Sequence, residues 1–359
     1  MSKNAAFFQQ CRLALACGLL AAAAVHAQTI IVVQDQTQQA IQDALDMLGG
    51  PGTVIVPAGR YPVDGTLIIR GDGVTLQGDG DDTELFRTID ATTTPMAVST
   101  GQQLVRITGI RFEGFSNLDP DFGQLSSGQE VGVHIADGVD FRVDHCTFTR
   151  TGRSGVWTSG ATSGVVDHCV FVDLFNPVVD NLGYGVEVGG INMPEEVEPF
   201  GSGRATFIED SSFQLCRHSV ASNRAARYVF RFNHVTQNQI AHAVDAHGHE
   251  FGSMVGTEWV DVHDNLIEDP IYTGWAVRIR GGLGLVWNNT FIDYNEGIEL
   301  TQDTDQATGP VYISGNTIIP DTSPMVRARG TMGTPVFFLF LPDDYVPYPY
   351  PHPLATDSP

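Results

Sequence analysis

The sequence is poor in basic residues and in charge overall, and both shortages exclude classes of protein. Of its 359 residues, 19 are Lys or Arg and 42 are Asp or Glu, which gives a formal charge of −23. Such an acidic surface repels nucleic acid and anionic membranes, so neither is expected as a partner. Charged residues make up 17% and hydrophobic residues 42%, which argues against a disordered chain and predicts a substantial core.

A long hydrophobic run is also missing, because the apolar stretch at residues 13–25 is too short to span a bilayer. It follows Lys3 and Arg12 and precedes Ala27, the pattern of a secretory signal peptide. We therefore expect cleavage after residue 27 and a secreted or periplasmic protein without membrane contact. Two of the five cysteines lie in this segment, and the remaining three cannot form a disulfide-rich scaffold.

The sequence does contain an internal repeat, which predicts the fold. Segments such as "VDHCTF", "VDHCVF" and "VWNNTF" recur at intervals of 22 to 42 residues, which suits a coil of just over 20 residues with inserted loops. One column of the alignment contains Cys146, Cys169, Ser211, Asn233, Asn265, Asn289 and Asn316. The column two residues later contains Phe148, Phe171, Phe213, Val235, Ile267, Phe291 and Ile318.

A second set of segments, including "GVWTS", "GVEVG", "AVDAH" and "AVRIR", alternates apolar and variable positions as a strand with one buried face does. No helical period competes after residue 50. Short strands at a fixed repeat, with polar turns between them, predict an all-β chain folded as a right-handed parallel β-helix. Its coils would stack about 4.8 Å apart.

The Asn column is interpreted as a ladder of stacked side chains that holds one corner of the coil in register. The same column places Cys146 above Cys169 on successive coils. This spacing suits either a disulfide or two stacked buried thiols, and free thiols are favoured.

The two ends of the chain differ from the repeat. Residues 37–50 place Ile41, Leu45 and Leu48 at helical spacing, which predicts a short helix that caps the solenoid. We assign residues 28–340 to one β-helix domain. The proline-rich tail, 341–359, is expected to pack irregularly or to fray.

The opening "IQDAL…PGTVIVPAGRYPV…VTLQGDG" resembles the pectate-lyase-like superfamily of right-handed β-helix proteins, and the repeat extends the similarity over residues 30–340. The segments "RHSVASN", "HAVDAHG" and "AVRIRGG" also resemble a secreted subgroup without a clear activity. The superfamily resemblance implies extracellular polysaccharide chemistry by lyases, hydrolases or epimerases, and it includes non-catalytic members. It is specific for the fold and unspecific for the reaction.

Outward positions on successive coils form two columns. The first contains His134, Trp157, Glu187, Ala221, Asp245, Arg278 and Glu299. The second contains Ala136, Ser159, Gly189, Asn223, His247, Arg280 and Thr301. Together they predict a continuous strip of side chains about 5 Å apart from coil to coil. Turn residues are expected to flank it, namely Tyr184, His218, His242, Trp275 and Glu296.

The strip has a structural and a functional interpretation. A solvated sheet face would pair Asp245 with Arg278 and Arg280 with Glu299. Function is favoured for the strip as a whole, because two of the few basic residues point from one strand beside an Asp-His strand. The insertions at 189–206 and 247–258 are expected to wall a groove there.

A metal site is the first alternative for the histidines of "AHAVDAHGHE". His242, His247 and His249 are expected to point in different directions from a turn, a strand and a loop, so no zinc site is predicted. No cofactor is certain, and calcium is left open. Its candidate ligands are Glu187, Asp245 and Glu299, or the acidic loop with Glu195, Glu196 and Glu198.

General acid and base chemistry is the favoured alternative. A polysaccharide lyase must neutralise the uronate carboxylate, which Arg278 or Arg280 could bind bidentately, before a base removes the C5 proton. His247, flanked by Asp245, is the predicted base, and His218 or Tyr184 the predicted acid. The predicted substrate-binding residues are Asn223, Glu187, Glu299, Tyr184, His242 and Trp275.

Two other functions remain open. A glycoside hydrolase needs two carboxylates about 5 to 9.5 Å apart, and Asp245 with Glu187 or Glu299 is the candidate pair. The paired aspartates that the resemblance implies for polygalacturonase-like hydrolases are not evident. A non-catalytic binder would use Trp157 and Trp275 as stacking platforms. In each case we expect a monomer whose partner is an acidic polysaccharide.

Overall fold

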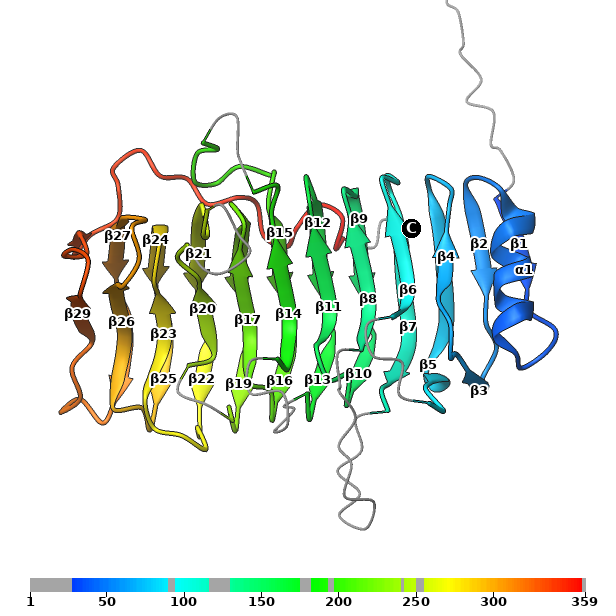
Figure 1. Ribbon diagram of the computed structural model, residues 1–359, viewed down its shortest axis with the longest axis horizontal. Helices are drawn as coiled ribbons and strands as arrows, with labels where there is room; N and C mark the ends of the chain where they lie inside the picture. The colour runs from blue at the N-terminus through cyan, green and yellow to red at the C-terminus, as the bar shows by residue number, and fades with distance from the viewer. Residues whose placement is uncertain are drawn as a thin grey trace, which may run out of the picture.

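A computed structural model describes residues 28–89, 94–115, 130–174, 182–192, 197–239, 242–249 and 255–356. Nearly all regular structure in these ranges is β-strand, and every strand pairing is parallel. Figure 1 shows the strands stacked side by side along the long axis of the molecule. The parallel β-helix predicted from the repeat is confirmed.

Ten strands form the sheet that carries the predicted strip, called sheet B below. In chain order they are β4 (Leu67–Ile69), β6 (Pro95–Thr100), β8 (Val131–Ala136), β11 (Ser154–Ser159), β14 (Tyr184–Gly189), β17 (His218–Asn223), β20 (Val244–Ala246), β23 (Trp275–Ile279), β26 (Glu296–Gln302) and β29 (Val326–Gly330).

The other twenty strands form sheet A, which wraps the remaining two sides of the coil. Its first strands are β1 (Thr29–Val32), β2 (Gly52–Ile55), β3 (Gly59–Pro62), β5 (Val74–Phe86) and β7 (Arg106–Glu113). One row then continues with β9 (Val139–Asp144), β12 (Ser163–Asp167), β15 (Thr206–Glu209), β18 (Arg227–Arg231), β21 (Trp259–His263), β24 (Gly282–Trp287), β27 (Thr308–Ser314) and β30 (Phe337–Phe338). The other row contains β10 (Thr147–Thr149), β13 (Val170–Val172), β16 (Ser212–Gln214), β19 (His234–Thr236), β22 (Leu266–Glu268), β25 (Thr290–Ile292) and β28 (Thr317–Ile319).

The long strands β5 and β7 bend around the corner between the two rows, and this makes sheet A continuous. Strand β5 pairs with both β2 and β3, and β7 pairs with both β9 and β10. A typical later coil visits β11, β12 and β13 before β14 returns to sheet B.

The corner after the longer row of sheet A contains the predicted Asn ladder. The backbone N–H of Asn233 donates to Oδ1 of Asn265 at 2.9 Å, and Asn265 and Asn289 continue the chain of bonds to Asn316. The residue before each ladder position adopts a left-handed conformation, for example Asn288 with φ 55°. Because this conformation is costly for residues other than glycine, the ladder bonds help to hold the bend.

The core lies inside the solenoid and follows the predicted apolar column. The rings of Phe148 and Phe171 stack at 5.0 Å between centroids, and those of Phe171 and Phe213 at 4.6 Å. Cys146, Cys169 and Cys216 are buried and unbonded, in line with the preference for free thiols.

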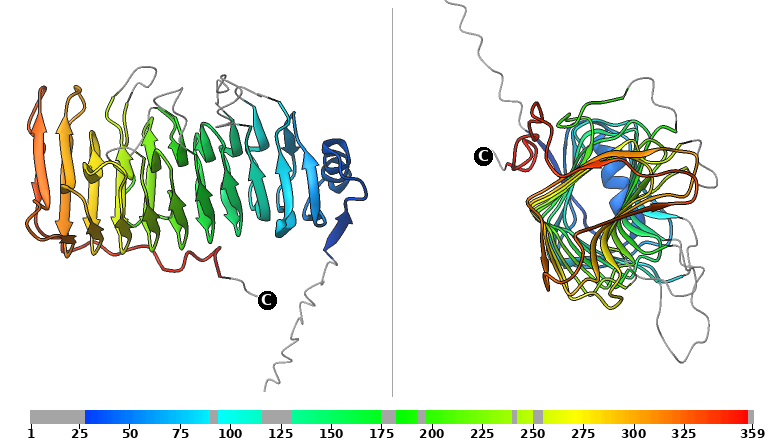
Figure 2. Two further views of the ribbon diagram at one scale, coloured as in Figure 1. Left: turned by 90° about the horizontal axis from the view of Figure 1, so that it is seen from below. Right: turned by 90° about the vertical axis from the view of Figure 1, so that its left-hand side faces the viewer.

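A single helix, α1 (Gln38–Leu48), is present in the described ranges and packs against β1, β2 and β4. Thr37 provides its N-cap, and Gly49 ends it in a left-handed conformation (φ 61°), as the sequence spacing indicates. Figure 2 shows α1 at the N-terminal end of the solenoid. In the described part of the chain no helix has the length and apolarity to cross a membrane.

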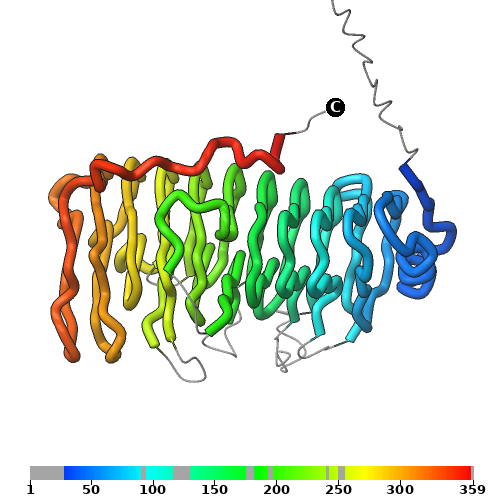
Figure 3. The backbone as a smooth tube through the Cα atoms, turned by 90° about the horizontal axis from the view of Figure 1, so that it is seen from above, coloured from blue at the N-terminus to red at the C-terminus, as the bar shows by residue number. Residues whose placement is uncertain are grey.

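The tail packs against the solenoid along residues 341–356, called the strap below. Figure 3 shows it running along the outside of the coils, back toward the N-terminal half. Arg231 donates to the carbonyl oxygens of Tyr348 and Pro349 at 2.7 and 2.8 Å, and the backbone N–H of His352 donates to Glu209 at 2.7 Å. Residues 341–356 therefore pack irregularly, without helix or strand, as one of the two expectations for the tail has it, and they do not fray because arginines of sheet A bind their backbone.

Candidate functional site

The first predicted column of the strip is formed on the outer face of sheet B. Successive parallel pairs join its members in the predicted order: His134, Trp157, Glu187, Ala221, Asp245, Arg278 and Glu299. Each member therefore lies one strand from the next, about 4.8 Å away.

The second column is formed where strands β20 and β23 end. Asn223 pairs with Gly189, whereas His247 and Arg280 directly follow the last strand residues. Their backbone N–H groups still donate to Ser222 and Ala246 of the preceding coil, so the parallel ladder continues through them. His247 thus lies on the strand of Asp245, and Arg280 lies on the strand of Arg278, as predicted.

The carboxylates at the centre of the strip are buried, which differs from the solvated-face alternative. Asp245 and Glu299 have 0% exposure, although both point away from the core. The reason lies in the neighbouring side chains, because long arginines and histidine rings lie over these short carboxylates. Arg278 and Arg280 keep 21% and 19% of their side chains exposed.

The ion pairs also differ from those expected. Arg280 binds Asp245 through two nitrogens, at 3.1 Å from Oδ1 and 2.6 Å from Oδ2. Arg278 instead binds Glu299 at 2.8 Å. The diagonal position two residues along the next strand is within reach of a long guanidinium, and this contact replaces the direct pair of Asp245 with Arg278.

Asp245 is the centre of a histidine cluster. Its Oδ2 lies 2.7 Å from Nε2 of His247, 3.3 Å from Nε2 of His242 and 3.9 Å from Nε2 of His218. Burial alone would raise the pKa of Asp245, but Arg280 and the imidazoles hold it well below its usual value. The carboxylate is therefore ionised at neutral pH.

The histidines of the quoted stretch consequently do not all point apart, and the prediction is wrong for His242. Both His242 and His247 approach Asp245, and His218 on the preceding strand is the third member. His249 alone turns away, since its Nδ1 lies 2.8 Å from the exposed Asp305. The repeat places His218 and His242 in one flanking row, but it could not show that both rings turn toward Asp245, because ring rotation does not follow from the register.

An aromatic row runs beside the strip. The ring of Tyr184 stacks on His218 at 5.6 Å, His218 meets His242 at 4.3 Å, and His242 stacks on Trp275 at 6.1 Å. Four of the five residues expected in turns are instead the first residues of strands: Tyr184, His218, Trp275 and Glu296. They lie three residues before its first column, a spacing that would put them on the opposite face of a regular strand. The contacts of His218 and His242 with Asp245, and of Arg278 with Trp275, show that this row nevertheless lies beside the strip.

Further arginines lie on this face, and the sequence reasoning missed them. Arg153 binds Glu187 through two nitrogens at 2.7 Å and lies 4.1 Å over the ring of Trp157. Arg329 pairs with Glu299 and lies 5.5 Å from the ring of Trp275. Arg153 directly precedes strand β11. Extending the flanking row of strand-starting residues by one position toward the N-terminus would therefore have found it.

The calcium ligands proposed from the sequence are not brought together. Glu187, Asp245 and Glu299 lie on separate strands, and each is paired with at least one arginine. Glu195 and Glu196 lie outside the described residues. Glu198 pairs with Arg204 at 3.1 Å.

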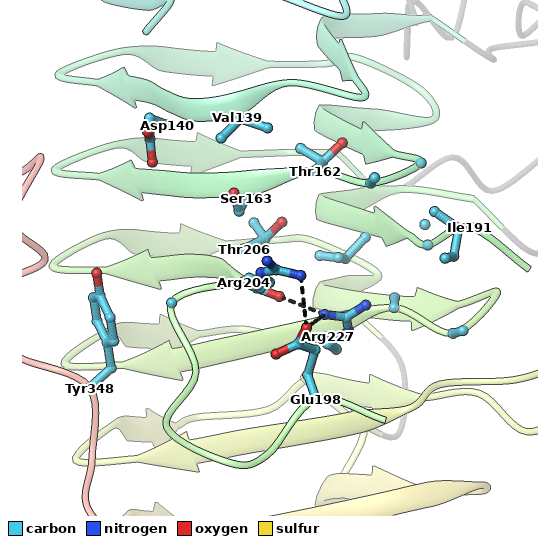
Figure 4. Close-up of a pocket in the computed structure, with 18 residues that line it drawn as sticks. Val139, Asp140, Thr162, Ser163, Ile191, Glu198, Arg204, Thr206, Arg227 and Tyr348 are labelled. Atoms are coloured by element: carbon cyan, nitrogen blue, oxygen red, sulfur yellow. Dashed lines mark hydrogen bonds and ion pairs between the residues drawn. The ribbon is translucent and has the colours of Figure 1, made fainter. Parts of the chain in front are cut away.

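The insertion after β14 borders a groove on a different side of the coil. The groove has a volume of about 770 Å³. Figure 4 shows it between the starts of sheet A strands and residues 197–204, with Tyr348 of the strap at one edge. Among its charged lining residues, Glu198 pairs with both Arg204 and Arg227. At the strip itself there is a hollow of about 20 Å³, which has room for one water molecule. It is lined by Tyr184, Glu187, Ala221, Ser222, Asn223 and His247.

The coil geometry defines the class of protein as a right-handed parallel β-helix, and known structures of that class resemble the chain. No family model and no curated protein sequence matches it. A polygalacturonase from Erwinia carotovora ssp. carotovora superposes with a TM-score of 0.57 at 12% identity, over 86% of this chain and 96% of that one. An exopolygalacturonase from Thermotoga maritima gives 0.53 at 12% identity, over 85% and 89%.

A mutant tailspike protein of E. coli bacteriophage HK620, solved with a pentasaccharide, gives a TM-score of 0.50 at 15% identity. The match covers 80% of this chain and 61% of the tailspike, so the chain spans about three fifths of that protein. At such identities these likenesses show the shared fold.

Proposed function

We propose that the protein acts on a uronate-containing polysaccharide at the strip, by β-elimination. The observation that carries this proposal is the ion pair of His247 with the buried Asp245, beside two arginines of the next strand. Two fold neighbours are polygalacturonases and a third was solved with a pentasaccharide, which supports a carbohydrate ligand.

His247 is the proposed base. When Nε2–H faces Asp245, the carboxylate sets the tautomer and stabilises the imidazolium that forms when the other ring nitrogen takes a proton. In β-elimination the base removes the C5 proton, its electron pair forms the C4–C5 double bond, and the C4–O bond breaks. The leaving oxygen then takes a proton from an acid.

Arg278 is the better candidate for the substrate carboxylate. Arg280 uses two of its nitrogens to hold Asp245, whereas Arg278 contacts Glu299 through Nε and keeps 21% of its side chain exposed. A guanidinium that neutralises the uronate makes the C5 proton more acidic. Arg280 then serves to fix Asp245.

Tyr184 is favoured over His218 as the acid. Burial raises the pKa of Tyr184 to about 12, so the phenol holds its proton at neutral pH, and Tyr184 lines the same hollow as His247. His218 donates from Nδ1 to the carbonyl oxygen of His242, and burial holds its pKa well below the usual value. Its Nε2 therefore has no proton to give in the neutral form.

A glycoside hydrolase is the second candidate, because two carboxylates of the strip have pKa values shifted in opposite directions. Burial raises the pKa of Glu299, while Arg280 and the imidazoles hold that of Asp245 well below its usual value. Such a split is what an acid and base pair requires. Both side chains are fully buried and paired with arginine, however, which favours the lyase.

The test is a panel of uronate polymers incubated with the purified protein, followed by ultraviolet absorbance for unsaturated products and by a reducing-end assay. The lyase proposal predicts both signals, and a hydrolase gives reducing ends alone. His247→Ala should lower the rate by about 10²- to 10⁴-fold. His249→Ala is the matched control, because that ring lies outside the strip, and it should leave the rate unchanged. Binding of a polymer without either product would contradict both enzyme functions and favour a non-catalytic carbohydrate-binding protein.

We also propose that residues 1–27 direct export to the periplasm or beyond. The basic start, the apolar run and Ala27 support this. Mass spectrometry of the protein from the exported fraction should find an N-terminus at Gln28, and an intact chain in the cytoplasm would contradict the proposal.

A further inference from the structure

We propose that His218, His242 and Asp245 form a binding site for one divalent transition-metal ion, with Zn²⁺ as the reference ion. The inference goes beyond the proposed function and does not rest on it. It starts from convergence, because one ligand atom from each of the three residues lies within 4.8 Å of the others. Across the described ranges this is the one group of three such ligands.

The distances are close to those of a metal site. Ligand atoms bound to zinc at 2.0–2.1 Å lie about 3.3 Å from each other. Nε2 of His242 already lies 3.3 Å from Oδ2 of Asp245, and Nε2 of His218 lies 3.9 Å from the same oxygen. A shift of about 0.6 Å by His218 would bring its distance from Asp245 to the same value.

The tautomer of His218 provides an independent argument. Its Nδ1 lies 2.7 Å from the carbonyl oxygen of His242, and a carbonyl can only accept, so Nδ1 carries the proton. Nε2 therefore presents a lone pair toward the Asp245 carboxylate, which is also an acceptor. Two acceptors that face each other in a buried site are stabilised when a cation, either a proton or a metal ion, lies between them. Metal-bound histidines are oriented in this way, with the second nitrogen donating to a backbone carbonyl.

The remaining polar atoms of the cluster agree with this assignment. Nε2 of His218 and both ring nitrogens of His242 are buried without a hydrogen-bond partner, although His242 Nε2 lies near Asp245. Such atoms cost stability unless something satisfies them. A metal ion would satisfy one nitrogen of each ring.

The neighbours of the cluster hold its ligands in place. Tyr184 stacks on the ring of His218 and Trp275 on the ring of His242, with interplanar angles of 13° and 15°. Arg280, on the next strand, donates hydrogen bonds to both carboxylate oxygens of Asp245 and so fixes the orientation of the carboxylate. Orientation by surrounding groups is a regular feature of metal ligands.

The donor set selects the kind of metal. Two imidazoles and one carboxylate suit Zn²⁺ and similar transition metals, whereas Ca²⁺ and Mg²⁺ prefer oxygen ligands throughout. Three protein ligands leave at least one coordination position for water or a sugar hydroxyl. The site is therefore of the open type, and it borders His247.

Metal binding is tested on the full protein after treatment with a chelator, by calorimetric titration with Zn²⁺ and by metal analysis after desalting. Saturable binding of one ion is expected, together with a rise in the unfolding temperature, whereas Ca²⁺ should give neither. Co²⁺ should produce a visible absorption band from its nitrogen and oxygen ligands. An absence of saturable Zn²⁺ binding overturns the proposal.

Variants distinguish this site from weaker surface sites. His242→Asn and His218→Gln should each weaken Zn²⁺ binding at least 100-fold, while thermal unfolding without metal shows whether they remain folded. The control is the double variant His145→Asn and His168→Asn, which removes two stacked, half-exposed rings that could bind zinc adventitiously. Binding that persists in both cluster variants, or that is lost in the control, overturns the assignment. Because no readout is activity, the result is independent of the lyase assay.

Discussion

The outer face of sheet A under the strap and the outer face of sheet B bury their side chains in different ways. On sheet A the strap covers an apolar cluster that includes Phe207, Val229 and Trp259, and Tyr348 of the strap packs against it. On sheet B the buried groups are Asp245, Glu299 and the histidine cluster, and they are covered largely by neighbouring side chains of the same face.

The two faces differ in the hydrogen bonds of their buried polar groups as well as in polarity. The arginines under the strap donate to its backbone carbonyl oxygens, so these main-chain groups are matched, although Nε1 of Trp259 is buried without a partner. In the cluster around Asp245, ring nitrogens remain without partners. An unmatched buried polar group costs about 1–3 kcal/mol. The face under the strap is built for stability, and sheet B retains a costly arrangement where a ligand would act.

The largest expected effect comes from unpairing Asp245. Arg280→Met leaves a buried carboxylate without its arginine, and removing one partner of a buried ion pair costs about 3–5 kcal/mol. Urea denaturation of the metal-free protein measures this, and the uronate assay should show activity falling as well. Arg204→Met is the control, because its side chain is 78% exposed, and it should change stability by less than about 0.5 kcal/mol. Equal stabilities of the two variants would contradict the importance of the pair.

Two tryptophans sharpen the comparison. Trp259 is fully buried in the apolar cluster of sheet A, where Phe200 packs against its ring, and Trp259→Ala should cost about 3–5 kcal/mol while activity per folded molecule is unchanged. Trp275 is partly exposed on sheet B beside Arg278. Trp275→Ala should lose less stability and should raise KM for the polymer. Denaturation curves and steady-state kinetics on both variants test the contrast, and the reverse pattern would mean that the roles of the two faces are exchanged.

Most of the fold could be predicted from the sequence, because coil stacking repeats one short pattern. The Asn column, the Phe column and the outward column from His134 to Glu299 all appear in the predicted order. A parallel register fixes which residues are neighbours, so aligning the repeats amounts to aligning strands.

The details of the site could not be predicted, since they depend on where long side chains extend. The register places Asp245 opposite Arg278, yet Arg280 reaches it diagonally. The convergence of His218 with His242 depends on ring rotation as well as register. The sequence left open whether the tail packs or frays, because its docking depends on Arg231, more than a hundred residues earlier.

The smallest effect expected is a difference in pH dependence. Asp261 lies under the strap and is bound by the neutral donors Tyr345 and Trp287. Burial raises the pKa of Asp261 above 3.8. At Asp245, by contrast, Arg280 lowers the pKa of the carboxyl group. A raised pKa in the folded state means that stability from this group is fully present below about pH 3.8 and is lost as pH rises through the raised value.

Asp261→Asn removes this titration while keeping a side chain of similar size. The stability of the wild type relative to the variant should therefore decrease as pH rises from below 3.8 toward neutrality. Denaturation of both proteins across that range measures it. A wild type that gains stability relative to the variant with rising pH would show that Asp261 is stabilised as an anion, and the strap face would then resemble sheet B in its electrostatics.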